Sequence, residues 1–120
     1  MTDWGADRKA LFEEWYQLLR GNRSARFALA QKNSTDREDA RKMLQVWESF
    51  SHDLLLHTLS GDAEVANIDF QNPLRELAEG VSPDRARRWL SALRRAEEQI
   101  DRNANVRLAL EAAFLDAPAL

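Results

Sequence analysis

The chain has 120 residues, of which 17 are basic and 20 acidic, and its formal net charge is −3. This length suits a single domain, which we expect to span residues 1–120, and a domain of this size needs neither metal nor disulfide to fold. The absence of cysteine excludes a disulfide framework and a thiol nucleophile, and the acidic balance argues against a dedicated nucleic-acid binder.

Helices and no strands are predicted, because apolar residues recur at helical spacing and no run alternates apolar and polar residues with β-branched enrichment. The expected helices cover residues 6–20, 23–32, 36–60, 73–79, 83–102 and 106–116. Their connections are mostly short, which favours antiparallel packing of consecutive helices. We therefore expect an all-α fold, a single helical bundle of about five to six helices.

Several helix ends carry sequence signals. Thr35 is expected to cap the third helix, with Glu38 reaching back to the Thr35 amide in a capping box. Gly61 is the expected stop of that helix. Asn72-Pro73 and Ser82-Pro83 each place an N-cap residue before a proline at the first helical position, so they predict the starts of the fourth and fifth helices.

The apolar stripes of the predicted helices indicate the core. Trp15, Trp47 and Trp89 fall on these stripes, so we expect all three to be buried. Trp4 lies near the N-terminus and is ambiguous. His52 and His57 flank an apolar ridge of the third helix, where we expect both to be partly exposed.

No motif for catalysis or for a cofactor is found. The four glycines are too far apart to form a phosphate-binding loop. Glu48, His52 and Asp53 leave a metal enzyme open as an alternative, although such a site needs ligands from several helices. No apolar stretch approaches the ~18 residues of a membrane span, and no signal peptide is visible. We expect a cytoplasmic, non-enzymatic protein with no cofactor, metal or small-molecule substrate.

The fifth predicted helix carries an arginine-rich face. Its members are Arg85, Arg88, Arg95 and Arg102, with Arg87 and Arg94 beside them. Several lie near the helix N-terminus, where the helix dipole disfavours cations. Two interpretations are open: the arginines pair with acids of the bundle, such as Glu97 and Glu98, or they face a partner. An acidic protein surface and a nucleic acid both fit the second.

The last predicted helix is apolar on nearly all sides, and only Arg107 and Glu111 are polar within it. These two are four residues apart and can pair on one stripe. Leu108, Ala112 and Leu115 form a second apolar face in addition to the core face. Such a helix is either central in its bundle or covered by a neighbouring chain.

Three short passages form a further pattern over residues 47–115. They are Trp47 followed by Asp53-Leu-Leu, the Asn67-containing segment Ala-Asn-Ile-Asp, and Asn103-Ala-Asn105 before Leu-Ala-Leu-Glu. In these passages the chain resembles the C-terminal collar domain of bacterial DNA polymerase III clamp-loader subunits. The likeness is greatest to delta-prime subunits, whose collar domain is similar to that of gamma/tau.

The resemblance implies a helical bundle that packs beside equivalent domains in a ring-shaped collar. That collar holds the ATPase modules that load the sliding clamp in DNA replication. The implied partners are other clamp-loader subunits, through their collar domains, and DNA is reached only indirectly. The family's subunits are longer and carry their nucleotide-binding and zinc-binding modules N-terminal to the collar, which implies a C-terminal fragment or a truncated relative. The rival hypothesis is a nucleic-acid-binding or regulatory domain that uses the fifth helix.

Within the bundle, the motif residues have structural roles that we favour. Asn103 is expected to end the fifth helix and Asn105 to cap the sixth. Asp53 is expected to pair with an arginine inside the bundle.

Overall fold

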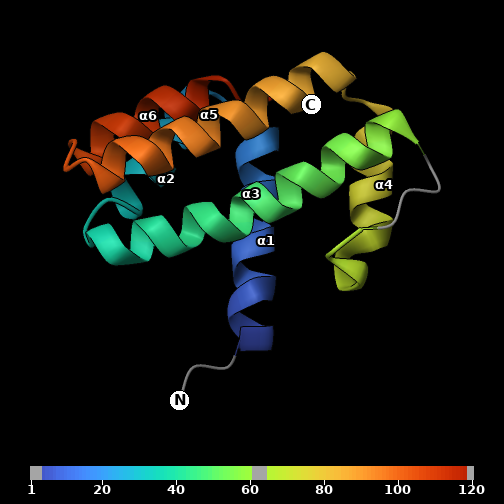
Figure 1. Ribbon diagram of the computed structural model, residues 1–120, viewed down its shortest axis with the longest axis horizontal. Helices are drawn as coiled ribbons and strands as arrows, with labels where there is room; N and C mark the ends of the chain where they lie inside the picture. Colours follow the sequence, from blue (N-terminus) through green and yellow to red (C-terminus); the bar gives the residue numbers. More distant parts are fainter. Residues whose placement is uncertain (1–3, 61–64, 119–120) are drawn as a thin grey trace.

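The computed structural model describes residues 4–60 and 65–118, and this part of the chain is a helical bundle without strands (Figure 1). Its elements are α1 (Trp4–Arg20), α2 (Arg23–Lys32), α3 (Arg37–Leu59), the 3₁₀ helix η1 (Ile68–Phe70), α4 (Gln71–Glu79), α5 (Pro83–Asp101) and α6 (Val106–Leu115). The predicted all-α class and the six α-helices are confirmed. No helix in the described ranges combines the length and apolar character that crossing a membrane requires.

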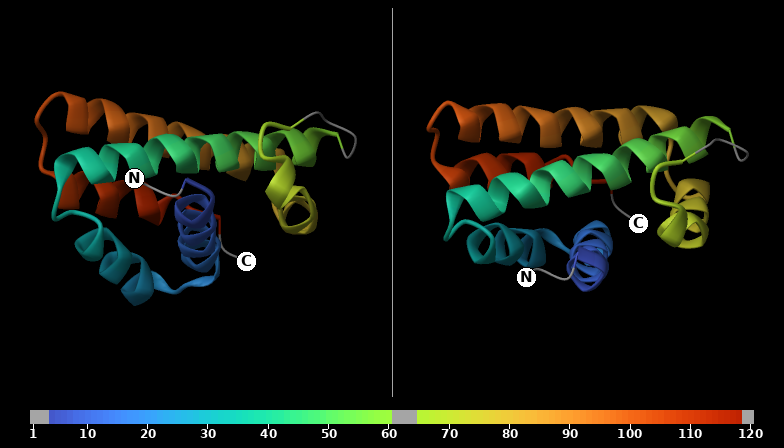
Figure 2. Two further views of the ribbon diagram at one scale, coloured as in Figure 1. Left: turned by 90° about the horizontal axis from the view of Figure 1, so that it is seen from below. Right: turned by 60° about the horizontal axis from the view of Figure 1, so that its bottom comes forward.

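Helix α3 is the element around which the others pack. Figure 2 shows α5 on one side of α3 and α1 and α4 on the other, with α6 running beside α3 and α5. Helices α3, α5 and α6 run lengthwise together, whereas α1 and α4 cross α3 steeply (Figure 1). The helix of 23 residues is long enough to support both groups.

The core is aromatic at its centre. Trp15, Trp47 and Trp89 are fully buried, as predicted. The Trp47 ring lies 5.4 Å from the ring of Phe114, and its indole N–H donates to the backbone carbonyl of Leu11 at 3.1 Å. The indole N–H of Trp15 donates to the Ser51 hydroxyl at 3.1 Å. The burial state of Trp4 lies outside the described residues.

Helix α3 begins one residue later than predicted. Asp36, and not Thr35, is its N-cap, and the Asp36 carboxylate accepts a hydrogen bond from the Asp39 amide at 2.9 Å. The capping-box prediction is therefore wrong. A carboxylate is the better acceptor at this position, because its charge also interacts favourably with the helix dipole. Gly61, the predicted stop, lies outside the described residues, and the C-cap is Ser60.

The predicted start of α4 is also wrong. The helix begins at Gln71 because η1 runs directly into it, and Phe70 is the N-cap residue without a side-chain capping bond. Pro73 lies within the first turn of α4, where a missing N–H removes no intrahelical hydrogen bond. The start of α5 follows the prediction, since the Ser82 hydroxyl accepts from the Arg85 amide at 3.2 Å ahead of Pro83.

The joint between α5 and α6 follows the prediction for both asparagines. Asn103 has a positive φ of 63°, which asparagine tolerates better than most residues. The Asn103 amide donates to Ile100 and the Ala104 amide to Gln99, which together end α5 as a Schellman motif. The Asn105 side chain then accepts from the Leu108 amide at 3.0 Å and caps α6.

Arg26 connects three helices from a buried position. Its guanidinium donates to the backbone carbonyls of Leu18, Phe114, Ala117 and Pro118 at 3.0 to 3.3 Å. Burial lowers the pKa of Arg26 from its ordinary value. Two of these carbonyls belong to the C-terminal ends of α1 and α6, where the helix dipole favours a cation. The arginine thus holds the start of α2 against both ends.

Replacing Asn105 with Ala is expected to lower the free energy of unfolding by ~1 kcal/mol, because α6 loses the acceptor of its Leu108 amide. Chemical denaturation measures this change. The matched control is Asn103→Gly, since glycine adopts a positive φ without strain and stability should stay within about 0.5 kcal/mol. Equal stability of Asn105→Ala and the wild type would contradict the capping role.

Candidate protein-binding surface

Four arginines of the predicted basic face are exposed and without an acidic partner. Arg85, Arg88, Arg95 and Arg102 are all exposed, and none forms an ion pair with any residue that the structure describes. The two neighbours of this face behave differently. Arg87 lies 3.3 Å from Asp84, and Arg94 lies 3.9 Å from Glu48. Pairing within the bundle therefore accounts for the flanking arginines and not for the face itself.

Helix α6 is not central in the bundle. Its core face, which includes Phe114, is buried, but Leu108 is 56% exposed and Leu115 is 47% exposed. Ala112 lies exposed between them on the same outer face. Arg107 and Glu111 pair at 3.6 Å, as their spacing predicted. Central burial is therefore wrong for the outer face, which remains available to a neighbouring chain.

The arginines of α5 and the apolar face of α6 border common hollows. One hollow of about 130 Å³ between the two helices is lined by Arg95 and Ala112, among others. A second, of about 120 Å³, is lined by Arg85, Arg88 and Leu115. We call the region formed by Arg85, Arg88, Arg95, Leu108, Ala112 and Leu115 the α5–α6 surface. Arg102 lies beyond it, at the C-cap of α5.

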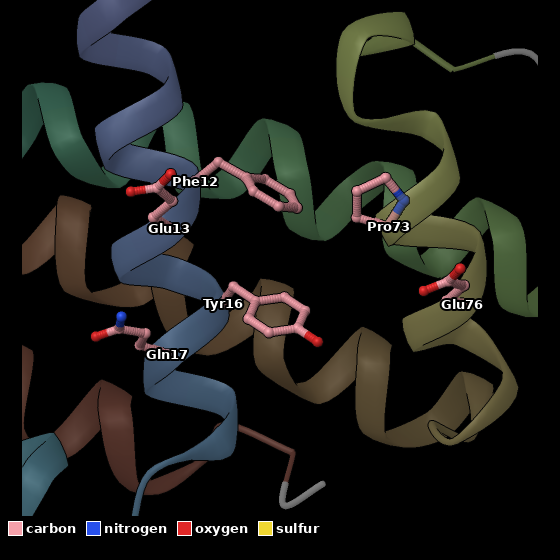
Figure 3. A pocket seen from close by; sticks show the side chains of 6 residues that line it. All are labelled: Phe12, Glu13, Tyr16, Gln17, Pro73 and Glu76. Atoms are coloured by element: carbon pink, nitrogen blue, oxygen red, sulfur yellow. The ribbon is translucent and has the colours of Figure 1, made fainter.

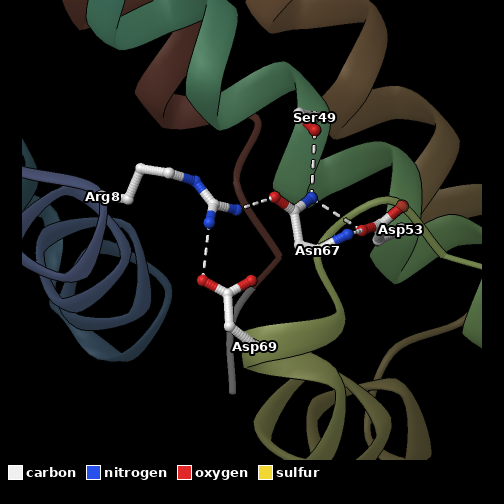
Figure 4. Close-up of polar contacts among 5 residues, drawn as sticks. All are labelled: Arg8, Ser49, Asp53, Asn67 and Asp69. Carbon is white, nitrogen blue, oxygen red and sulfur yellow. Dashed lines mark hydrogen bonds and ion pairs between the residues drawn. The ribbon is translucent and has the colours of Figure 1, made fainter. Parts of the chain in front are cut away.

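Two motif residues, Asp53 and Asn67, meet in a buried polar network (Figure 4). The fully buried Asp53 carboxylate accepts from the Asn67 amide and side chain, both at 2.7 Å, and from the Ala66 amide at 3.1 Å. The Asn67 side chain also donates to the Ser49 hydroxyl at 3.0 Å. These bonds tie the segment before η1 to α3, so both residues are structural.

The predicted partner of Asp53 is therefore wrong: it binds an asparagine and backbone amides instead of an arginine. The arginine lies one step further away, because Arg8 of α1 donates to the Asn67 side-chain oxygen and pairs with Asp69 at 2.6 Å. Three N–H donors meet the hydrogen-bonding need of the buried Asp53 carboxylate, so no arginine has to be buried beside it.

Glu48, His52 and Asp53 do not converge on one site. His52 is exposed, whereas Asp53 is fully buried and committed to Asn67. Within the described ranges, no group of three or more histidine, aspartate or glutamate side chains is arranged to hold a metal ion. His57 is only 6% exposed, so its predicted partial exposure is wrong. Neither of its ring nitrogens has a hydrogen-bond partner among the residues that the structure describes.

A carboxyl pair lies between α3 and α5. Desolvation by burial raises the pKa of Glu48 to about 8, and a hydrogen bond to Glu97 and repulsion from it act in the same direction. The charge of Arg94 acts in the opposite direction. Gln45 donates to the Glu97 carboxylate at 2.9 Å. One oxygen of Glu48 is buried without a hydrogen-bond partner. The Glu48 carboxyl beside Glu97 is therefore part of the packing of these two helices.

Sequence reasoning missed both the Glu48–Glu97 pair and the buried Arg26. Each partner lies far along the chain, so no local spacing could reveal the contact. The sequence indicated Glu97 only as a possible partner of the arginines, and Arg26 lies on a short helix with no acid nearby in sequence. Comparisons with family models, curated proteins and solved structures give no match to this chain.

Replacing Asp53 with Ala is expected to lower the free energy of unfolding by about 3 kcal/mol, because the buried amides of Asn67 lose a charged acceptor. Thermal and chemical unfolding measure it. Ser49→Ala removes one peripheral hydrogen bond of the same network and should cost only ~1 kcal/mol. If Asp53→Ala lowers the free energy of unfolding no more than Ser49→Ala does, the network does not hold the segment before η1.

Replacing Glu48 with Gln is expected to change how stability depends on pH. A folded-state pKa of about 8, raised from 4.5, means that the folded chain holds the proton more tightly than the unfolded chain. The wild type therefore loses stability as pH rises from 4.5 to about 8, and the glutamine variant lacks this loss. Unfolding curves across this range measure it, with exposed Glu98→Gln as the control. If the free energy of unfolding of wild type and of Glu48→Gln changed with pH in the same way, the raised pKa of Glu48 would be contradicted.

Proposed function

We propose that this chain is a non-catalytic assembly module that binds other helical protein domains through the α5–α6 surface. The observation that carries the proposal is the set of exposed arginines of α5, without an ion-pair partner among the described residues, beside the exposed Leu115 of α6. Protein interfaces are enriched in arginine, and their buried centre is apolar. Exposed arginines around Leu115 provide both elements on one surface.

The energetics of the isolated chain do not favour this surface. Arg85 lies in the first turn of α5, where the helix dipole disfavours a cation, and it has no acidic partner in the described part of the chain. Leu108 and Leu115 leave about half of their surface in water. An acidic, partly apolar partner would lower both the electrostatic energy of the arginines and the cost of exposing the leucines to water, because it would neutralise the former and cover the latter.

We place the module in a bacterial DNA polymerase III clamp loader of delta-prime type, in the cytoplasm. The support is the pattern of motif residues and their positions. Asp53 and Asn67, from two separate passages, bind each other, and Asn103 and Asn105 form the joint that aligns α5 with α6. The partners would then be the collar domains of other clamp-loader subunits, with DNA reached only through the assembled complex.

A nucleic-acid-binding role is the second candidate, because the same unpaired arginines could contact phosphates. Two observations make it the weaker one. Phosphate contacts give no reason for the exposed Leu108 and Leu115 on the outer face of α6. The net charge of −3 would also repel a polyanion beyond the local contact.

The test is complex formation with the collar regions of the other clamp-loader subunits, measured by size-exclusion chromatography with light scattering. We expect a stable complex. The double variant Arg88→Glu, Arg95→Glu should weaken its affinity by roughly tenfold or more, because like charges would then face each other across the interface. Arg75→Glu, a single charge reversal at an exposed position of α4, is the control and should leave binding unchanged.

Two results would count against this function. Absence of association with every subunit would remove the clamp-loader assignment. Binding to DNA that weakens steeply with salt, and that the Arg88→Glu, Arg95→Glu variant loses, would favour the nucleic-acid role instead.

A further inference from the structure

A second surface feature lies on the far side of the bundle, between α1 and α4. Figure 3 shows Phe12 and Tyr16 pointing from α1 toward α4, with Pro73 and Glu76 facing them from α4. Together with Glu13 and Gln17, these residues line a pocket of about 260 Å³. Small-molecule sites are usually larger, about 300–1,000 Å³. The size of this pocket suits a single side chain from another protein.

The pocket is aromatic at its base and acidic at its edge. The Phe12 ring is held in place by the Phe70 ring, which stacks on it at 4.3 Å. Glu13 and Glu76 are exposed, and neither forms an ion pair with any described residue. No cationic residue lines the pocket. The missing charge at this edge is therefore positive.

An arginine side chain fits this combination better than a lysine. The guanidinium is planar, stacks on aromatic rings and binds carboxylates through two N–H groups. The chain already places two guanidinium groups against aromatic rings near the pocket. The guanidinium of Arg20 lies 5.5 Å from the Tyr16 ring centre, and that of Arg8 lies 5.4 Å from the Phe70 ring centre while pairing with Asp69.

We infer that the pocket between α1 and α4 receives an arginine of the α5–α6 surface of a second copy of this chain. The two features have opposite charge, and both are unpaired in the described chain. Helix α5, which carries these arginines, lies on the opposite side of α3 from α1 and α4, which line the pocket (Figure 2). The inference deepens the proposed assembly function, and it rests on that function for the use of the α5–α6 surface.

Such a contact is head-to-tail, because each copy offers a different surface to each neighbour. A contact of this kind leaves one basic and one acidic surface free after every addition, so it builds rings or filaments and not a closed two-fold dimer. The chemistry of the contact also predicts strong dependence on salt, since both groups lie at the surface.

The experiment is sedimentation velocity of the full chain up to about 1 mM, a range that detects weak contacts. Wild type is expected to associate with rising concentration and to dissociate with salt. Glu76→Arg, and separately Arg88→Glu with Arg95→Glu, should each shift the midpoint at least about tenfold. Glu79→Arg makes the same charge change on α4 outside the pocket and should behave as wild type.

The most specific test mixes the Glu76→Arg variant with the variant that carries Arg88→Glu and Arg95→Glu. The mixture restores one native contact and creates one charge-swapped contact, so it should associate more tightly than either variant alone. Circular dichroism verifies that both variants fold. A wild type that stays monomeric, or a Glu76→Arg variant that differs no more than Glu79→Arg, overturns the inference. Since no partner subunit is present, these outcomes leave the binding of clamp-loader collars to its own test.

Discussion

The burial of α3 on several sides is the constraint on which the rest of the fold depends. Its buried residues include Leu44, Trp47, Phe50 and Leu54, which no single neighbouring helix could cover. Helix α5 packs on one side, and α1 and α4 pack on the other. Phe50 meets Phe12 of α1 and the Phe70 ring at the start of α4, so the aromatic core fixes how these crossing helices approach.

Buried polar groups then determine how the helix ends and connections are held. Asp53 receives three N–H donors and secures the segment before η1. Arg26 donates to four carbonyls, two at the ends of α1 and α6 and two in the segment after α6. These hydrogen bonds offset the cost of burying both charged groups. Glu48 differs, because one of its oxygens has no partner, and the pair it forms with Glu97 retains a proton near neutral pH.

The packing also determines which surfaces remain available. Covering α3 with α5 and α6 leaves the arginines of α5 and the leucines of α6 facing outward together. Covering it with α1 and α4 leaves Tyr16 and Glu76 facing each other across a shallow pocket. One chain thus presents a basic, partly apolar surface along α5 and α6 and an acidic, aromatic pocket between α1 and α4.

The sequence alone determined the local features. Helical spacing predicted the six α-helices and the burial of Trp15, Trp47 and Trp89, and local capping chemistry predicted the roles of Asn103 and Asn105. These features depend on residues within a few positions of one another, so the order of residues contains them. The start of α3 was misplaced by one residue because Thr35 and Asp36 are both good N-caps.

Only the tertiary structure decided which distant groups meet. The Asp53–Asn67 bonds, the partners of Arg26, the Glu48–Glu97 pair and the pocket beside Tyr16 each join separate helices or segments. The arginines of α5 were visible in the sequence, but whether an acid of the bundle reached them was not. The reason is physical: periodicity gives the face of a helix on which a residue lies, whereas the packing of helices gives what that face contacts.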